Sequence, residues 1–168
     1  IQTSYIGWLG TMGADYYDYL IAANGMIPEK NHKYFSEKIV YLPTYQVNDS
    51  KETLPENLFT REDLGLPKDS FVFCCFNNTY KITPVVFDIW ARILKSVENS
   101  VMMIYVANVQ AKKNLIKEIT HRGIEPERFV FGEKLTRSKY LDRYRSADLF
   151  LDTFPYNAGT TSSDALKM

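Results

Sequence analysis

The sequence predicts an α/β fold in which a parallel sheet is flanked by helices. From Phe71 onward, short runs rich in β-branched and aromatic residues alternate with longer runs whose apolar residues recur at helical spacing. Four strand segments interleaved with helical segments favour a parallel, doubly wound sheet, because parallel neighbours need crossover connections. The 168-residue chain is 45% hydrophobic and 14% aromatic, which is sufficient for a buried core.

The first two β-α units follow one another directly. Residues 71–76 (FVFCCF) predict a buried strand, and residues 84–97 predict a helix. The apolar residues that share one face of this helix are Val86, Ile89, Trp90, Ile93 and Leu94. Residues 101–106 predict a second strand and residues 110–121 a second helix, with Gly123 as its C-terminal cap.

The pattern continues to the end of the chain. Residues 128–131 predict a short third strand, and Thr136 is a candidate N-cap for a helix over residues 138–146. Residues 148–152 (DLFLD) predict a fourth strand, and Thr160 opens a further helix.

The first part of the chain has a different organisation. Residues 7–13 are rich in glycine, residues 39–43 predict a strand, and residues 48–68 are polar with two prolines, which is typical of a linker. We therefore expect two parts, residues 1–66 and residues 67–168. The chain opens on Ile1 and stops at Met168, shortly after a helix start. We therefore expect the two parts to belong to a longer protein.

Composition excludes several classes of partner. Lys plus Arg equals Asp plus Glu at 20 each, so no global charge favours nucleic acid or an anionic membrane. The longest apolar run, residues 101–107, is far shorter than the about 20 residues that span a bilayer. Cys74 and Cys75 are adjacent in a predicted strand, where we expect two buried thiols in a reducing compartment. With no secretory signal visible, we expect a cytoplasmic protein.

Ligands of open parallel sheets bind at the carboxyl ends of the strands, and three segments occupy that edge. The first, residues 76–81 (FNNTYK), ends on Lys81, which could place a point charge on a phosphate. Taken alone, the position of Lys81 favours a solvated loop lysine.

The second segment, residues 152–166 (DTFPYNAGTTSSDAL), crowds a helix start with hydroxyl groups and free backbone N–H groups. Such a helix start favours a phosphate. Asp164, one turn further, could accept hydrogen bonds from ribose hydroxyls. An ordinary N-cap with an acid in the first turn would have the same sequence.

The third segment, residues 133–148, places Arg137 at a helix start, where a cation opposes the helix dipole and therefore needs another partner. Residues 7–13 do not match the GxGxxG dinucleotide pattern, which disfavours a nicotinamide enzyme. His32 and His121 lack metal-ligand spacing, so we expect no metal site.

These segments resemble the catalytic region of the O-GlcNAc transferase family, including its Spindly-like and bacterial members. Besides FNNTYK and ADLFLDTFPYNAGTTSSDAL, the resemblance includes IQTSYIGWLGTMGADYYDYLI, SEKIVYLP and RFVF, in order over nearly the whole chain. It implies a GT-B fold, in which a cleft between two Rossmann-like lobes binds a UDP-sugar without a metal or other cofactor. Residues 1–66 would then carry the end of the first lobe plus a linker, and residues 67–168 the front of an incomplete second lobe.

The resemblance also implies an activity and partners. The activity is inverting transfer of GlcNAc from UDP-GlcNAc to Ser or Thr of an acceptor protein, with no nucleic acid or membrane partner. TPR repeats are implied upstream of Ile1, together with the first-lobe histidines proposed to handle acceptor or sugar.

Individual roles follow from the same resemblance. Lys81 is implied to neutralise the departing diphosphate, Thr160 and Thr161 to contact the pyrophosphate, and Asp164 to contact the ribose. The remaining positions matched to the nucleotide site are Asn78, Tyr80, Arg137, Arg143 and Gly159.

Two positions depart from the family pattern. Gly159 stands where many members have a histidine before the threonine pair, and Tyr140 replaces a second histidine. Diphosphate binding could therefore be weaker or differently arranged. The alternatives are a nucleotide-binding or interaction module that has lost catalysis, and another GT-B sugar-nucleotide enzyme.

Overall fold

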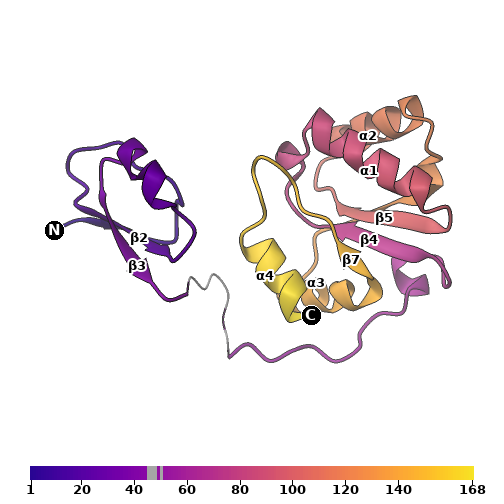
Figure 1. The fold of residues 1–168 in the computed structure, drawn as a ribbon. Coiled ribbons are helices and arrows are strands. Elements are labelled where there is room, and N and C mark those ends of the chain that lie inside the picture. Colours follow the sequence, from indigo (N-terminus) through magenta and orange to yellow (C-terminus); the bar gives the residue numbers. More distant parts are fainter. Residues whose placement is uncertain (45–48, 50) are drawn as a thin grey trace. The chain divides into compact units, whose positions relative to one another are not determined.

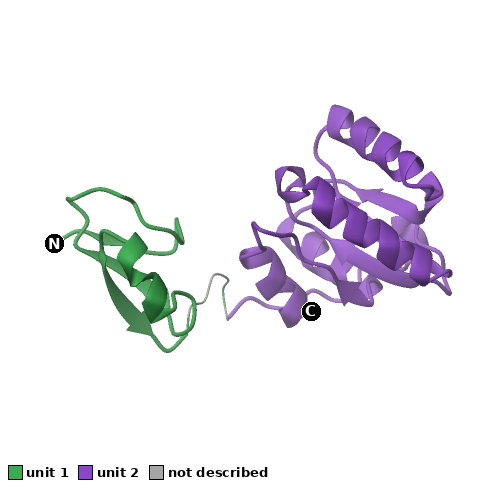
Figure 2. Ribbon diagram, turned by 45° about the horizontal axis from the view of Figure 1, so that its top comes forward, with its two compact units in different colours: residues 1–49 green, residues 50–168 purple. Residues whose placement is uncertain are grey.

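A computed structural model describes residues 1–44, 49 and 51–168 of the chain. The chain forms two compact units, Ile1–Asp49 and Ser50–Met168 (Figure 2). Asn48, where the predicted linker begins, lies outside the described residues. No helix among the described residues is long and apolar enough to cross a membrane.

The first unit is a small three-stranded parallel sheet in the order β1-β2-β3 (Figure 1). Its strands are β1 (Thr3–Ser4), β2 (Tyr19–Ala23) and β3 (Lys38–Leu42), and the 3-10 helix η1 (Glu29–Tyr34) joins β2 to β3. The strand predicted over residues 39–43 is confirmed as β3, whereas β1 and β2 were not predicted.

The second unit is built on a four-stranded parallel sheet in the order β6-β5-β4-β7. Its strands are β4 (Phe71–Cys75), β5 (Ser100–Tyr105), β6 (Phe129–Gly132) and β7 (Leu149–Phe150). The predicted class, a parallel sheet flanked by helices, is confirmed. β7 is shorter than predicted, since regular pairing with β4 is limited to two residue pairs, Phe73 with Leu149 and Cys74 with Phe150.

Helices cover both faces of this sheet (Figure 1). The α-helices are α1 (Pro84–Ser96), α2 (Val109–His121), α3 (Arg137–Arg143) and α4 (Thr160–Lys167), and the 3-10 helices are η2 (Glu62–Leu64), η3 (Thr79–Lys81), η4 (Pro126–Arg128) and η5 (Tyr144–Ser146). Gly123 has a φ of 68° directly after α2, as its capping role requires. The helix predicted over residues 138–146 is instead α3 followed by the tighter turn η5.

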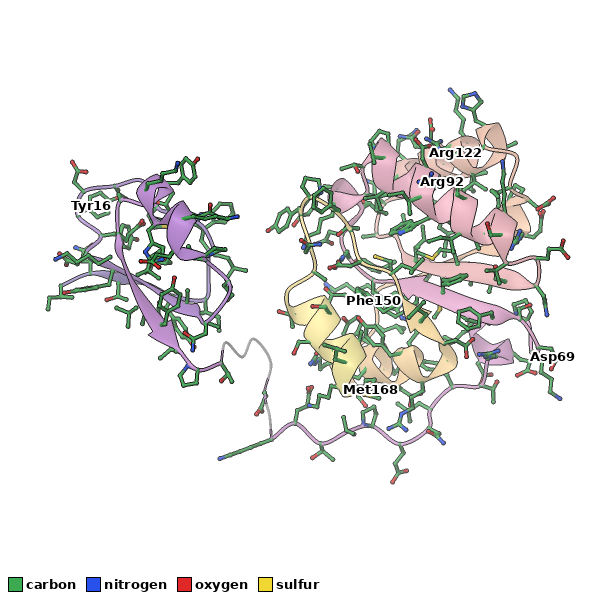
Figure 3. All side chains as sticks on the ribbon, viewed as in Figure 1. Tyr16, Asp69, Arg92, Arg122, Phe150 and Met168 are labelled. Atoms are coloured by element: carbon green, nitrogen blue, oxygen red, sulfur yellow. The ribbon has the colours of Figure 1, made fainter. Side chains whose placement is uncertain are left out.

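Side chains that alternate along the strands build two cores. Phe73 and Cys75 join the cluster under α1 and α2, whereas Val72 and Cys74 join the cluster that includes η5. Phe150, labelled in Figure 3, packs against both clusters. The prediction that both cysteines are buried thiols is confirmed, and burial raises the pKa of each to about 12, which leaves them unreactive.

The segment before β4 belongs to the second unit. Arg61 donates to the Ser70 carbonyl (2.8 Å) and forms an ion pair with Asp148 (2.8 Å). The backbone N–H groups of Leu58 and Phe59 donate to the buried carboxylate of Asp142 (2.8 and 3.0 Å). Residues 51–66, which were predicted as linker, therefore pack with the second compact unit, because distant side chains satisfy the backbone of a segment whose local composition is that of a linker.

The core under α1 yields a stability prediction. Leu94 is 1% exposed, whereas Ile89 on the same helix is 40% exposed. Leu94→Ala should lower the free energy of unfolding by about 2–5 kcal/mol, since it leaves a cavity in a packed core. Ile89→Ala is the matched control and should lower the free energy of unfolding by much less. Urea denaturation of the two variants measures the difference, and equal costs would contradict the assigned core.

Candidate functional site

The loops that follow β4 and β7 lie together because these two strands are paired. Asn77 Nδ2, after β4, donates to Asp152 Oδ1 (3.0 Å) and Thr153 Oγ1 (2.9 Å), both after β7. Asp152 Oδ1 also accepts from the backbone N–H groups of Thr153 (2.7 Å) and Ala158 (2.8 Å). One carboxylate oxygen thus holds the two loops at the carboxyl edge of the sheet.

Lys81 crosses from the first loop to the second. Its Nζ donates to the carbonyl of Asn157 (3.0 Å) and lies 4.0 Å from the centroid of the Tyr156 ring. Tyr80 is exposed, with its ring centroid 6.0 Å from that of Tyr156. Asn78 is exposed and accepts the Lys81 backbone N–H through its carbonyl (3.0 Å). The structure therefore places Lys81 beside the loop that leads into α4.

The N-terminus of α4 begins at Thr160, with Gly159 at the N-cap position. The first regular helical bond of α4 runs from the Ser163 N–H to the Gly159 carbonyl (3.2 Å). The preceding N–H groups have no intrahelical acceptor and can receive an anion. The carbonyl of Thr161 accepts the Tyr144 hydroxyl (3.0 Å), which ties this helix start to η5.

Arg137 and Asp164 form a bidentate ion pair. Arg137 Nη1 and Nη2 donate to the two oxygens of Asp164 (2.6 and 2.7 Å), and the Asp164 carboxylate is almost completely buried. The sequence predicted that Arg137, a cation at a helix start, needs a partner. In the structure this partner is the carboxylate of Asp164, which offsets the positive charge at the start of α3. A ribose hydroxyl would have to share Asp164 with Arg137.

Glu52 is a part of this network that sequence analysis did not find. Its two oxygens accept from Arg137 Nε and Nη2 (2.8 Å each), and Lys167 Nζ lies 3.3 Å from Oε2. The hydrogen bond from Arg137 is the main reason that the pKa of Glu52 falls to about 2, and these carboxylates in turn raise the pKa of Arg137. Glu52 lies 85 residues before Arg137 in the polar segment, so no local pattern could reveal the contact.

Arg143 is buried without a carboxylate partner among the described residues. Its guanidinium stacks 3.9 Å from the Phe76 ring centroid, and Nη1 donates to the Glu133 carbonyl (3.1 Å). The buried Nε has no hydrogen-bond partner in the described part of the chain, and burial lowers the pKa of this arginine. Arg143 lies at a pocket of about 120 Å³ whose other lining residues are Phe76, Tyr105, Glu133, Lys134, Leu135 and Tyr140.

Tyr140 connects this pocket to α4. Its hydroxyl lies 2.8 Å from that of Tyr144, which donates onward to Thr161. Burial is the main cause that raises the pKa of Tyr140 to about 12, so the phenol remains protonated at neutral pH. The structure thus joins the second and third predicted segments through two tyrosines, one at the position where the family pattern has histidine.

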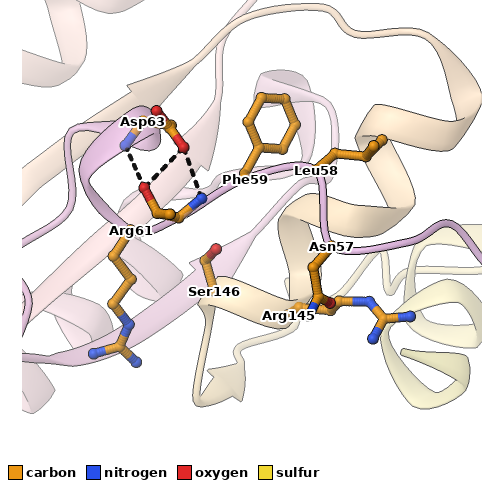
Figure 4. Close-up of a pocket in the computed structure, with 8 residues that line it drawn as sticks. Asn57, Leu58, Phe59, Arg61, Asp63, Arg145 and Ser146 are labelled. Atoms are coloured by element: carbon orange, nitrogen blue, oxygen red, sulfur yellow. Dashed lines mark hydrogen bonds between the residues drawn. The ribbon is translucent and has the colours of Figure 1, made fainter.

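A larger pocket, of about 400 Å³, contains none of the predicted site residues (Figure 4). It lies beside the segment before η2, where Thr60 and Asp63 cap each other through the hydrogen bonds drawn in Figure 4. The glycine-rich stretch, residues 7–13, lies in the first unit. There, Glu37 accepts from Thr11 Oγ1 (2.7 Å) and the Met12 N–H (2.6 Å), which holds that loop against its own sheet.

Comparison with known proteins identifies relatives of this chain. Residues 51–168 match the family model described as glycosyl transferase family 41. The chain is 36% identical over 172 aligned residues to the probable UDP-N-acetylglucosamine–peptide N-acetylglucosaminyltransferase SEC of Arabidopsis thaliana, an alignment that covers 99% of the chain and 18% of that protein. It is 35% identical to the corresponding transferase of Caenorhabditis elegans over 68% of the chain and 10% of that protein.

A solved structure agrees with these matches. A variant of the O-GlcNAc transferase of Thermobaculum terrenum superimposes with a TM-score of 0.82 and 26% identity, covering 100% of this chain and 32% of that one. The GT-B fold expected from the resemblance is therefore confirmed for the region present. The chain spans less than a fifth of the length of these two curated transferases.

Gly132 should be intolerant of a side chain. A Cβ at this position would lie 2.6 Å from Arg143 Nη1, which is itself buried. Gly132→Ala must therefore displace the guanidinium or strain β6, and should cost about 1–3 kcal/mol of stability. Urea denaturation checks this cost, and unchanged stability would show that Arg143 can leave its place freely.

Glu52 should contribute stability that depends on pH. Because the folded-state pKa, about 2, lies below the ordinary value of 4.5, the contribution is complete above pH 4.5 and is lost as pH falls towards 2. Glu52→Gln should therefore lower the melting temperature near neutral pH, with a difference from wild type that shrinks as pH falls. Glu56→Gln is the control, since Glu56 makes no hydrogen bond or ion pair among the described residues. A Glu52 difference independent of pH would contradict this assignment.

Proposed function

The chain belongs to glycosyl transferase family 41, and from that premise we propose that it forms part of an enzyme that transfers GlcNAc from UDP-GlcNAc to Ser or Thr of proteins. The named relatives are described as UDP-N-acetylglucosamine–peptide N-acetylglucosaminyltransferases. These matches favour an enzyme over a non-catalytic binding module. These relatives are several times longer than this chain, so the activity is proposed for an enzyme of which this chain is a part.

One observation carries the proposal: Lys81 lies beside the loop that leads into α4. A nucleoside diphosphate bound there meets both the lysine ammonium and the free N–H groups of Thr160 and Thr161. Both groups act where negative charge grows as the sugar leaves, which is the condition for electrostatic stabilisation of the transition state. Lys81 is therefore the catalytic residue that we assign.

We assign the nucleoside of the UDP-sugar to the pocket at Arg143. The pocket at Arg143 has the aromatic walls of Phe76 and Tyr140, which suit a planar base. Asp164, which lies within α4 and is paired with Arg137, is assigned to the ribose. Asn78, Tyr80 and Gly159 border the diphosphate.

The reaction is an inverting displacement at the anomeric carbon. The acceptor hydroxyl oxygen forms a bond to that carbon while the bond to the UDP oxygen breaks, and the diphosphate takes the bonding electron pair. The proton of the acceptor passes to a base that we assign to no residue of this chain. The proposal includes no metal, since Lys81 and α4 supply positive charge at the diphosphate.

The remaining parts of the proposal come from the family. We propose a cytoplasmic enzyme whose protein acceptor is selected with the help of TPR repeats outside this chain. The sugar, the acceptor protein and the repeats are assigned by similarity to longer proteins.

Calorimetric titration with UDP tests the site directly. The chain should bind UDP saturably in buffer with EDTA, and Lys81→Ala should weaken binding by roughly tenfold, since a charge-assisted contact is lost. The pair Thr160→Ala and Thr161→Ala removes two hydroxyl groups but keeps the backbone N–H groups, so it should weaken binding less than Lys81→Ala does. Lys95→Ala, in the last turn of α1, is the matched control and should bind as wild type does. No binding by a folded chain, or equal binding by Lys81→Ala, would contradict the assigned site.

In the complete enzyme, Lys81→Ala should reduce turnover by roughly 10² or more while the melting temperature stays nearly constant. The reason is that the lysine interacts most strongly with the charge that develops in the transition state. Release of UDP measures turnover, and thermal denaturation measures folding. Undiminished turnover would remove Lys81 from the mechanism.

A further inference from the structure

We propose that Tyr156 is a positioning residue of the nucleotide site, whose ring holds the Lys81 ammonium in place for the diphosphate. The proposal rests on the function proposed above for Lys81. Tyr156 belongs to the loop between β7 and α4, and no local sequence pattern connects it to a lysine 75 positions earlier. The contact exists only because the loops after β4 and β7 are neighbours.

The geometry leaves one side of the ammonium open. Lys81 Nζ lies 4.0 Å from the Tyr156 ring centroid and 3.0 Å from the Asn157 carbonyl oxygen. A lysine ammonium has three N–H donors. One N–H group donates to the Asn157 carbonyl, and a second can point at the face of the Tyr156 ring. The third N–H group is then available to a phosphate oxygen.

An aromatic partner suits this task better than a carboxylate would. The negative face of a tyrosine ring attracts a cation within about 6 Å of the centroid but carries no net charge. Lys81 is therefore positioned without losing the positive charge that a diphosphate needs. Arg137 shows the contrast, because two carboxylates, Glu52 and Asp164, already offset its charge.

The loop itself is braced so that Tyr156 has a defined place. Thr153 Oγ1 donates to the Tyr156 carbonyl (2.7 Å), and Asn157 Nδ2 donates to the Thr153 carbonyl (2.7 Å). Thr153 is 1% exposed and also accepts from Asn77. The backbone on both sides of Tyr156 is thus tied to the sheet edge, which allows its half-exposed ring to restrict a long, flexible lysine side chain.

A double-mutant cycle tests the proposal by calorimetric titration with UDP. Tyr156→Leu should weaken UDP binding by roughly two- to fivefold, the effect of one partly exposed cation–π contact. Tyr156→Phe keeps the ring and should bind as wild type does. In a Lys81→Met background, Tyr156→Leu should cause no further loss, because the ring acts through the lysine.

The outcomes separate this proposal from the function on which it rests. If Lys81→Met weakens binding but Tyr156→Leu does not, or if Tyr156→Leu costs the same in both backgrounds, the positioning role is overturned and the site assignment survives. If the folded wild-type chain does not bind UDP, or Lys81→Met has no effect, both are overturned.

A second measurement needs no ligand. Lys81 Nζ lies over the Tyr156 ring, 4.0 Å from its centroid. The NMR signals of the protons on the carbon bonded to Nζ should therefore be shifted upfield in wild type and Tyr156→Phe, and return to ordinary values in Tyr156→Leu. Unshifted Lys81 signals in the wild-type chain would overturn the proposal even if Tyr156→Leu failed to fold.

Discussion

The parallel pairing of β4 with β7 is the constraint on which the candidate site depends. The two strands are far apart in the chain, yet their pairing places the loops that follow them at one edge of the sheet. Asp152 then holds these loops together, because one of its oxygens accepts from Asn77, Thr153 and Ala158. Lys81 can reach the loop before α4 only within this frame. The placement of the candidate site is thus a consequence of strand order rather than of any single motif.

Three of the predicted site cations, Lys81, Arg137 and Arg143, are held in three different ways. Lys81 contacts a neutral carbonyl and a ring, so it keeps its positive charge for a ligand. The positive charge of Arg137 is offset by two carboxylates, so this residue adds little net charge to the candidate site. Arg143 is buried against Phe76 and borders the small pocket. Positive charge at the proposed diphosphate site is consequently concentrated on Lys81 and the start of α4.

Much of the fold follows from local sequence. Hydrophobic patterning located β4, α1, β5, α2 and β6 within a residue or two. The two-residue strands β1 and β7 carry too little periodicity to be located well. The segment before η2 has a linker's composition, and its docking onto Asp142 and Asp148 depends on side chains more than 75 residues away.

The sequence by itself determined the class of fold and the family, because ordered motifs and periodic patterns are local properties of the chain. Only the tertiary structure decided which partners those residues have. Glu52 on Arg137, Tyr156 under Lys81, and the absence of room for a Cβ at Gly132 all depend on contacts between distant segments. Such contacts arise from strand order and packing, which bring together residues that no local pattern relates.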